Sequence, residues 1–348
     1  MKKISYNIHS FFAAANSFDG FKSNFPQIFD GRKFDRIYIL KGGPGTGKST
    51  LMRKVGHCFE KPDIDITYIY CSSDTKSLDG VIIKKENMHY AIIDGTSPHM
   101  TDPLYPGAVE VLVNLGEGFD TQSLSRQKEK IIELNTLKSE AYKSAYKFLS
   151  LAGNIFNNIF DVFYNSDVYS KAEKLANEIL KNNIHDTIGV CTSSDYLVGA
   201  YGKDGYVRLD LPCIKKEYIS LTGDGFTEYA VIREIKKALA EDRLTENVFY
   251  SPLTTKMIDA VITPDMIIST DRCGYLSFDT ESIAGHLPYE YTVMCGFYRD
   301  AMEMSRNRFA KASEFHFMLE EIYSQNIDFS HNEKLTRSII EEISESIT

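Results

Sequence analysis

The sequence contains no tryptophan and only six cysteines, and no two of these cysteines form a Cys-x-x-Cys pair. Zinc knuckles need Cys-x-x-Cys pairs, and disulfide frameworks are typical of short secreted chains that are rich in cysteine. Neither kind of site is therefore favoured, and we expect reduced, mostly buried thiols.

Long hydrophobic runs are also missing. No apolar run approaches the roughly 18 residues that a membrane-spanning helix needs. The N-terminus, Met-Lys-Lys-Ile-Ser-Tyr-Asn, lacks the continuous apolar stretch of a signal peptide. We therefore expect a cytoplasmic protein that does not associate with a membrane.

An excess of positive charge is absent as well. The chain has 39 basic and 48 acidic residues, and its formal net charge is −9. Such a surface repels a polyphosphate backbone except at a local basic site, so general nucleic-acid binding is not expected. The 348 residues, 43% of them apolar, suffice for two cores of roughly 150 residues each.

One glycine-rich segment carries the strongest signal. Residues 42–49 read Gly-Gly-Pro-Gly-Thr-Gly-Lys-Ser, between an apolar strand at residues 36–40 and a helix expected from Lys48 to about Phe59. This pattern places backbone N–H groups around a β-phosphate at the positive end of a helix. Lys48 would reach the β- and γ-phosphates, and Ser49 would offer its hydroxyl to Mg²⁺. The residues expected to bind the nucleotide are Gly42, Gly43, Pro44, Gly45, Thr46, Gly47, Lys48, Ser49 and Thr50.

An aspartate that closes another apolar strand completes the expected metal site. Asp94 follows the apolar residues 90–93, as a Walker B aspartate does, and would hold Mg²⁺ together with Ser49. The alternative is an aspartate that caps the turn at residues 94–97. Gly95 stands where many ATP hydrolases have a glutamate that polarises water, so any hydrolytic base lies elsewhere.

The chain also repeats itself with a period of 180 residues. The repeated positions lie in strands and in the glycine loop: Tyr38-Ile39 recurs as Tyr218-Ile219, Gly43 and Gly45 as Gly223 and Gly225, and Leu78-Asp79 as Ile258-Asp259. With a small shift, Asp19-Gly20-Phe21 upstream resembles Asp204-Gly205-Tyr206. The N-terminal arm is therefore expected to belong to the repeat.

Short apolar strands alternate with helices in each copy, which indicates a parallel sheet with right-handed crossovers. Apolar residues at three- and four-residue spacing predict a helical tract after each copy. We therefore expect an α/β P-loop NTPase fold with a parallel sheet, duplicated as two homologous lobes. The expected parts are an intact P-loop lobe at 1–122, a helical tract at 123–185, a degenerate lobe at 186–297 and a C-terminal helical tract at 298–348.

The second copy has Thr227-Glu228-Tyr229 in place of the lysine-containing end of the loop. Glu228 would repel phosphate and Tyr229 would crowd the metal, so this lobe is not expected to bind nucleotide in the same way. A residue that the second copy has lost together with Lys48 is more typical of a catalytic or binding role than a residue that both copies retain. Asp79, which persists as Asp259, is therefore favoured as a turn or cap residue.

Three further groups are open to two interpretations. Asp74 becomes Thr254 and follows a predicted strand, so it is the leading candidate for positioning water or an acceptor hydroxyl, with a solvated loop aspartate equally favoured. His99 could sense the γ-phosphate, but a plain loop histidine is favoured. Basic residues flank the first strand and are favoured as a solvated edge rather than phosphate ligands: Arg32, Lys33, Arg36 and Lys41.

The stretches 40–52, 71–83 and 94–110 together resemble a little-characterised bacterial family of predicted P-loop ATPases, also described as nucleotide kinases, with two tandem P-loop halves. The resemblance covers the first lobe well and the second mainly through the repeat. It implies ATP and Mg²⁺ as ligands but no established reaction. The degenerate second loop departs from members with two intact halves, which questions any mechanism that needs two active sites.

Three functions compete. The leading hypothesis is slow ATP hydrolysis that drives a conformational change, with Lys48 on the phosphates, Ser49 and Asp94 on Mg²⁺ and Asp74 placing water. The second is a kinase for a small acceptor, and the third is a non-catalytic nucleotide sensor that binds a protein partner. No Asn-Lys-x-Asp tetrapeptide is present, which modestly favours ATP over GTP. The acceptor or partner and the oligomeric state stay open.

Overall fold

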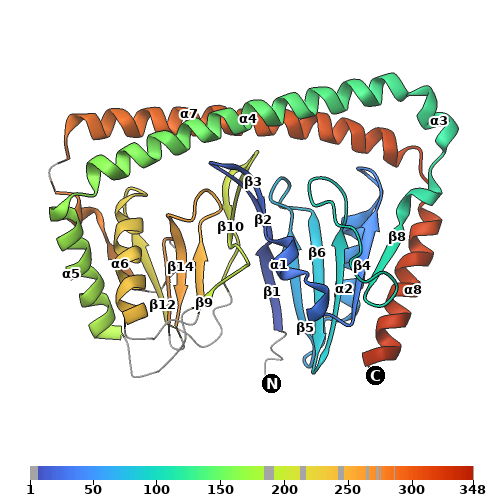
Figure 1. Ribbon diagram of the computed structural model, residues 1–348, viewed down its shortest axis with the longest axis horizontal. Coiled ribbons are helices and arrows are strands. Elements are labelled where there is room, and N and C mark those ends of the chain that lie inside the picture. The colour runs from blue at the N-terminus through green and yellow to red at the C-terminus, as the bar shows by residue number, and fades with distance from the viewer. Residues whose placement is uncertain are drawn as a thin grey trace.

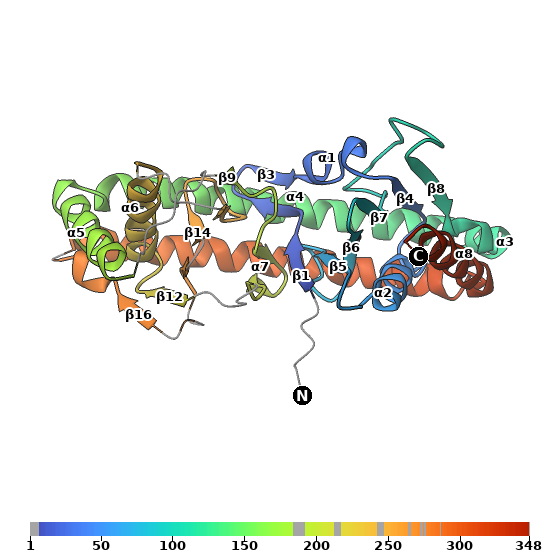
Figure 2. The same ribbon diagram turned by 90° about the horizontal axis from the view of Figure 1, so that it is seen from below.

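The computed structural model describes residues 7–183, 192–211, 217–241, 247–263, 266–271, 274, 276–285 and 287–347. Two sheet-containing lobes lie side by side beneath a pair of long helices, α4 (Lys128–Phe163) and α7 (Tyr289–Ser324) (Figure 1). Figure 2 shows the two helices running alongside each other over the full length of the molecule. The protein is therefore an α/β molecule with a helical roof shared by both lobes.

The sheet of the first lobe is mixed, not parallel as expected. Its strands, in spatial order, are β1 (Asn7–Phe12), β5 (Asp65–Tyr70), β6 (Leu78–Lys85), β7 (Met88–Asp94), β4 (Arg36–Lys41) and β8 (Glu110–Asn114). Strand β6 is antiparallel to both neighbours, and the other pairs are parallel. Only Glu86 and Asn87 separate β6 from β7, too short a link for the crossover that a parallel pair needs.

The sheet of the second lobe has the same arrangement of strand directions. Its strands, in spatial order, are β16 (Leu276–Asp279), β12 (Glu217–Thr222), β15 (Met266–Ser269), β14 (Ile258–Ile262), β13 (Asn247–Tyr250) and β9 (Thr192–Ser193). Here β14 is the strand antiparallel to both neighbours, while the remaining pairs are parallel. Thus β14 occupies the place that β6 has in the first lobe.

In each lobe a small hairpin follows the first strand of the sheet in the chain: β2 (Ala14–Ser17) with β3 (Gly20–Ser23) after β1, and β10 (Gly199–Gly202) with β11 (Gly205–Arg208) after β9. Gly20 and Gly205 close the two turns with φ values of +103° and +79°, which favour glycine. The remaining helices are α1 (Phe25–Ile28), α2 (Lys48–Cys58), α3 (Thr121–Arg126), α5 (Ser166–Asn183), α6 (Thr227–Glu241) and α8 (Phe329–Ile347), with 3₁₀ turns η1 (Gly31–Lys33), η2 (Leu115–Gly118) and η3 (Glu281–Ile283).

The helical tracts cross over in space. Helix α5 follows the first lobe in the chain but packs against α6 of the second lobe. Helix α8 follows the second lobe but packs against α2 of the first, where Ile339, Ile343 and Ile347 join its core. The last helix of each tract therefore packs on the lobe that the tract does not follow, and the two lobes stabilise each other (Figure 1).

The boundaries of the tracts differ slightly from expectation. The second tract begins with α7 at Tyr289, before the expected boundary at residue 298, and the first begins with α3 at Thr121. Among the described helices, none is both long and apolar enough to cross a membrane. Of the six cysteines, Cys191, Cys213 and Cys273 lie outside the described residues; Cys58 is exposed, so the expectation of buried thiols is wrong there.

Candidate functional site

The glycine loop joins a buried strand to a helix, as its pattern predicts. Residues Ile37 to Leu40 of β4 are at most 2% exposed, and α2 begins at Lys48 directly after the loop. Gly45 and Gly47 have φ values of +70° and +81°, which side chains other than glycine rarely adopt. Gly47 is the N-cap of α2 and has no side chain that could accept from the first amides of the helix. The N-terminus of α2 therefore offers N–H groups to an anion.

Lys48 and Asp94 meet at this loop. The Lys48 ammonium donates to the carbonyl oxygens of Gly42 (3.2 Å) and Gly43 (3.0 Å) and lies 3.7 Å from Asp94 Oδ2. Their side chains are only 11% and 16% exposed. The contact arises because β7 pairs directly with β4, with Asp94 opposite Leu40. Two residues 46 positions apart in the chain thus form one charged pair at the carboxyl ends of β4 and β7.

Asp94 also makes the turn contact that was the alternative interpretation. Its Oδ1 accepts from the Thr96 amide (2.8 Å) and from the Thr96 hydroxyl (2.6 Å). The other oxygen, Oδ2, faces Lys48. The carboxylate therefore both caps its own turn and presents one oxygen to the glycine loop.

Ser49 and Asp74 are connected through one short loop. Ser49 Oγ accepts from the Leu78 amide at 2.9 Å, and Asp74 Oδ2 accepts from the Ser77 hydroxyl at 2.9 Å. Because residues 77 and 78 are consecutive, Asp74 is held at the same edge as the glycine loop. Asp74 is neither fully exposed nor buried, and its Oδ1 lies 3.9 Å from Lys203 Nζ of the second lobe.

Asp79 and His99 form a buried pair, so the favoured turn or cap role of Asp79 is wrong, whereas His99 lies in the loop after β7, as favoured, but is buried and paired. Asp79 lies on β6 rather than in a turn, and its Oδ2 is 3.1 Å from His99 Nε2. The histidine is 7% exposed and stacks on Phe25 with ring centroids 4.2 Å apart. An aspartate within an apolar strand signals such a pair, because a buried carboxylate needs a partner.

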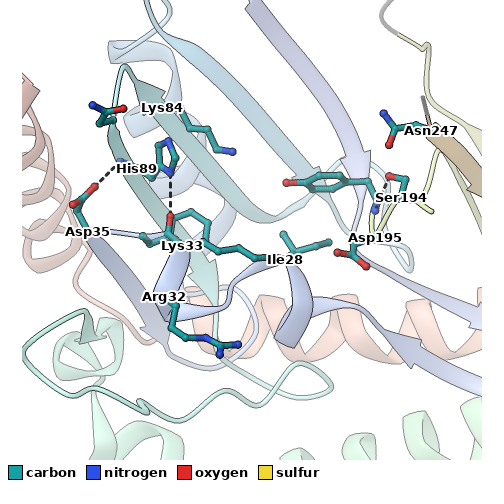
Figure 3. Close-up of a pocket in the computed structure, with 12 residues that line it drawn as sticks. Ile28, Arg32, Lys33, Asp35, Lys84, His89, Ser194, Asp195 and Asn247 are labelled. Atoms are coloured by element: carbon teal, nitrogen blue, oxygen red, sulfur yellow. Dashed lines mark hydrogen bonds between the residues drawn. The ribbon is translucent and has the colours of Figure 1, made fainter. Parts of the chain in front are cut away.

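The basic residues that flank β4 lie away from the loop, except for Lys41. A cavity of about 710 Å³ between the lobes is lined by Arg32, Lys33 and Lys84 of the first lobe and by Asp195 of the second (Figure 3). It lies near the start of β7, whereas Asp94 ends that strand. Lys41 donates to the carbonyl oxygens of Gly95 and Thr101, which fixes the segment after Asp94.

The C-terminal helices cover the outside of the glycine loop, which sequence reasoning missed. The Asn332 side chain is buried and donates to Thr46 O at 2.8 Å. A Cβ atom built on Gly45 would lie 2.5 Å from Glu320 O of α7, and one on Gly47 would lie 3.5 Å from the Phe329 ring of α8. The loop is therefore held by residues far away in the chain, with 286 positions between Thr46 and Asn332.

Comparison of the chain with protein-family models, with curated proteins and with solved structures finds no match. The site must be interpreted from its own geometry. Among the described residues, no group of three or more histidine, cysteine, aspartate or glutamate side chains is placed to hold a metal ion.

Substituting Asn332 tests how strongly α8 holds the loop. In Asn332→Ala, the buried Thr46 carbonyl loses its donor, which costs about 1–3 kcal/mol of unfolding free energy. Ser338→Ala, at an exposed position of the same helix, is the control and should change stability by less than about 0.5 kcal/mol. Urea unfolding measures both, and equal stability of the two variants would contradict this hold on the loop.

The corresponding loop of the second lobe is filled by its own carboxylates. Asp224 Oδ1 accepts from the amides of Phe226 (2.9 Å) and Thr227 (3.0 Å), and its Oδ2 accepts from the Tyr291 hydroxyl at 2.5 Å. Glu228 Oε2 accepts from the Gly225 amide at 2.7 Å. Amide groups that would otherwise be available to an anion are thus already used by two anions of the chain.

The pKa values of the two carboxylates are shifted in opposite directions. Burial disfavours the charge of Asp224, but hydrogen bonds from Tyr291 and two backbone amides outweigh it and lower the pKa of Asp224. Burial raises the pKa of Glu228 above its usual value. The ionised form of Asp224 is therefore the one that the folded loop stabilises.

The lowered pKa of Asp224 predicts a pH-dependent contribution to stability. Because its folded-state pKa lies below the unfolded value of 3.8, its contribution is present above that value and is lost as the pH falls through the folded pKa. Asp224→Ala should cost about 1 kcal/mol at pH 7, a modest value since the residue is exposed. The stabilities of the two proteins, measured by urea unfolding, should begin to approach each other as the pH falls below 3.8 and should converge below the lowered pKa of Asp224; a pH-independent difference would contradict the assignment.

Proposed function

We propose that the first lobe binds ATP with Mg²⁺ in the glycine loop and hydrolyses it slowly, and that the second lobe is a degenerate copy that arose by duplication. The observation that carries the proposal is the Lys48–Asp94 pair, 3.7 Å apart, at a loop that opens the α2 helix. A strand, glycine loop and helix in this order are the context that gives the motif its meaning. The resemblance to predicted P-loop ATPases agrees with it.

The duplication is supported by the two sheets. Each has six strands, and the sequence of parallel and antiparallel pairs is the same in both. The hairpins that follow the first strand of each sheet also correspond, with glycine at the same position of each turn. In the second lobe, Glu228 and Asp224 use the loop amides, so a triphosphate would have to displace two carboxylates.

The residues present fit the binding of a metal–triphosphate complex. Lys48 would exchange the Gly42 and Gly43 carbonyls for β- and γ-phosphate oxygens, and the α2 amides would hold the β-phosphate. Ser49 Oγ keeps its own proton and a further lone pair beside its bond from Leu78, and Asp94 offers a carboxylate, so both are oxygen ligands of the kind that Mg²⁺ prefers. Bound Mg²⁺ neutralises charge on the phosphates.

The water or acceptor would be placed from the Asp74 side. In hydrolysis, a bond forms between the water oxygen and the γ-phosphorus while the bond from that phosphorus to the β–γ bridging oxygen breaks, giving ADP and phosphate. Asp74, held by Ser77, would accept a hydrogen bond from the attacking water. The proton leaves with the water-derived phosphate or passes to Asp74.

One observation also favours transfer to an acceptor hydroxyl, the second candidate. A Cβ atom at position 95 would lie 2.3 Å from Ile39 Cγ2, so this backbone has no room for the glutamate that many ATP hydrolases place after the Walker B aspartate. A lobe without that base is suited to a kinase whose acceptor hydroxyl replaces water.

Single-turnover conversion of γ-labelled ATP with Mg²⁺ tests the proposal. Label released as inorganic phosphate supports hydrolysis. Label that appears on a compound only when small molecules from a cell extract are added supports the kinase. Binding without any turnover points to a sensor, and absence of ATP binding contradicts the proposal.

A further inference from the structure

The two small hairpins each reach into the opposite lobe. The tip of β10–β11 lies on the loop after β5 of the first lobe, where a Cβ atom on Gly202 would stand 3.1 Å from Ser72 O. The tip of β2–β3 lies on the loop after β13 of the second lobe, where the Phe18 amide donates to Leu253 O at 3.0 Å. Hence each lobe presents one hairpin tip to the carboxyl edge of the other.

The tip residues are equivalent in the repeat but differ in chemistry. With Asp19-Gly20 matched to Asp204-Gly205, Phe18 corresponds to Lys203. The strands on both sides of the two turns have the same lengths and pair in the same register, so that β2 corresponds to β10 and β3 to β11 position by position. One copy therefore places an aromatic ring at the tip, and the other places a cation.

Each tip residue suits the loop that it faces. Phe18 is 7% exposed and packs on Phe156, which in turn stacks on Phe226 of the degenerate loop with ring centroids 5.5 Å apart. The degenerate loop thus packs against an apolar aromatic cluster of Phe18, Phe156 and its own Phe226. Lys203 instead lies 3.9 Å from Asp74 Oδ1 and 2.8 Å from Asp204 Oδ2, with its side chain 20% exposed.

Lys203 is linked to the glycine loop through Asp74, whose Oδ1 lies 3.9 Å from the ammonium. Asp74 is held by the Ser77 hydroxyl, and the next amide, that of Leu78, donates to Ser49 Oγ at the start of α2. The lysine therefore stands on the loop that borders the expected terminal phosphate. Its flexible stem lets the ammonium leave the two aspartates for a more highly charged phosphate.

We propose that Lys203 is supplied by the degenerate lobe to contact the terminal phosphate of the nucleotide bound in the first lobe. The proposal rests on the function proposed above and gives the second lobe a role in the same site. While the bond from γ-phosphorus to the bridging oxygen breaks and the bond to the attacking oxygen forms, the ammonium keeps its protons and stabilises the negative charge of the transferring group.

Lys203→Ala tests the proposal in the full-length protein. The single-turnover rate with ATP should fall about 10²–10³-fold, whereas ADP, which lacks the terminal phosphate, should bind within about twofold of the wild type. Binding of ADP with aluminium fluoride, which mimics the transferring phosphoryl group, should weaken strongly. Lys22→Ala is the matched control, because Lys22 lies on the other hairpin and pairs only with Asp19 among the described ion pairs.

The outcomes separate this inference from the underlying function. If the wild type turns over ATP and Lys203→Ala does so at the same rate, the inference is wrong and the function stands. If the wild type binds no ATP, the proposed function itself fails. A double variant with Asp74→Asn distinguishes direct contact from an effect through Asp74: a rate equal to that of Asp74→Asn alone would show that Lys203 only positions the aspartate and would overturn the proposal.

Discussion

Lys48→Ala is expected to slow ATP turnover by at least about 10²–10³-fold. Removal of the ammonium takes away the charge-assisted hydrogen bonds to the β- and γ-phosphates, and loss of one such group from a preorganised site costs about 10²–10³ in rate. The variant also leaves Asp94 without its partner at 3.7 Å, which further disfavours a triphosphate beside that carboxylate. Single-turnover kinetics with γ-labelled ATP measures the loss.

The control for this variant is Lys54→Ala, an exposed lysine on the same helix. It should retain the wild-type rate. Thermal unfolding of both variants checks that the lobe is folded, because Lys48 also donates to two loop carbonyls. Turnover that survives Lys48→Ala in a folded protein would refute the assignment of the site.

The second large effect is on the free energy of unfolding and comes from the packing of α8 on the first lobe. Ile343 of α8 is fully buried in the core of the first lobe. Ile343→Ala should lower the free energy of unfolding by about 2–5 kcal/mol, since it removes buried apolar surface and leaves a cavity. Urea unfolding followed by far-ultraviolet circular dichroism measures the change.

Glu345→Ala, at an exposed position of the same helix, is the matched control and should change stability by at most about 0.5 kcal/mol. If Ile343→Ala behaves like this control, α8 does not stabilise the first lobe as described. The comparison thus tests whether the C-terminal tract covers the lobe at the other end of the chain.

The local sequence pattern was sufficient to predict the structure where consecutive residues determine it. The glycine loop between β4 and α2 was predicted from spacing alone, because strand, turn and helix are fixed by consecutive residues. Asp94 was predicted to end a strand, and the structure brings it to Lys48 because β7 pairs with β4. The roles of these residues in binding remain predictions.

Direction and long-range contact could not be deduced in the same way. The apolar runs of β5, β6 and β7 were consistent with parallel strands, and the direction depends instead on the links at residues 71–77 and 86–87, both of which are shorter than a parallel crossover needs. The Asp79–His99 pair depends on how β6 and the segment after β7 meet in space. Nothing local to residues 329–347 signals that α8 packs on α2 rather than on its own lobe.

The most direct test of the central claim is the number of nucleotides bound per chain, measured by equilibrium dialysis with a non-hydrolysable ATP analogue and Mg²⁺. We expect one nucleotide per chain in the wild type and none in Lys48→Ala, because the second loop is filled by Asp224 and Glu228. Two nucleotides per chain, or binding that is unchanged in Lys48→Ala, would contradict the account.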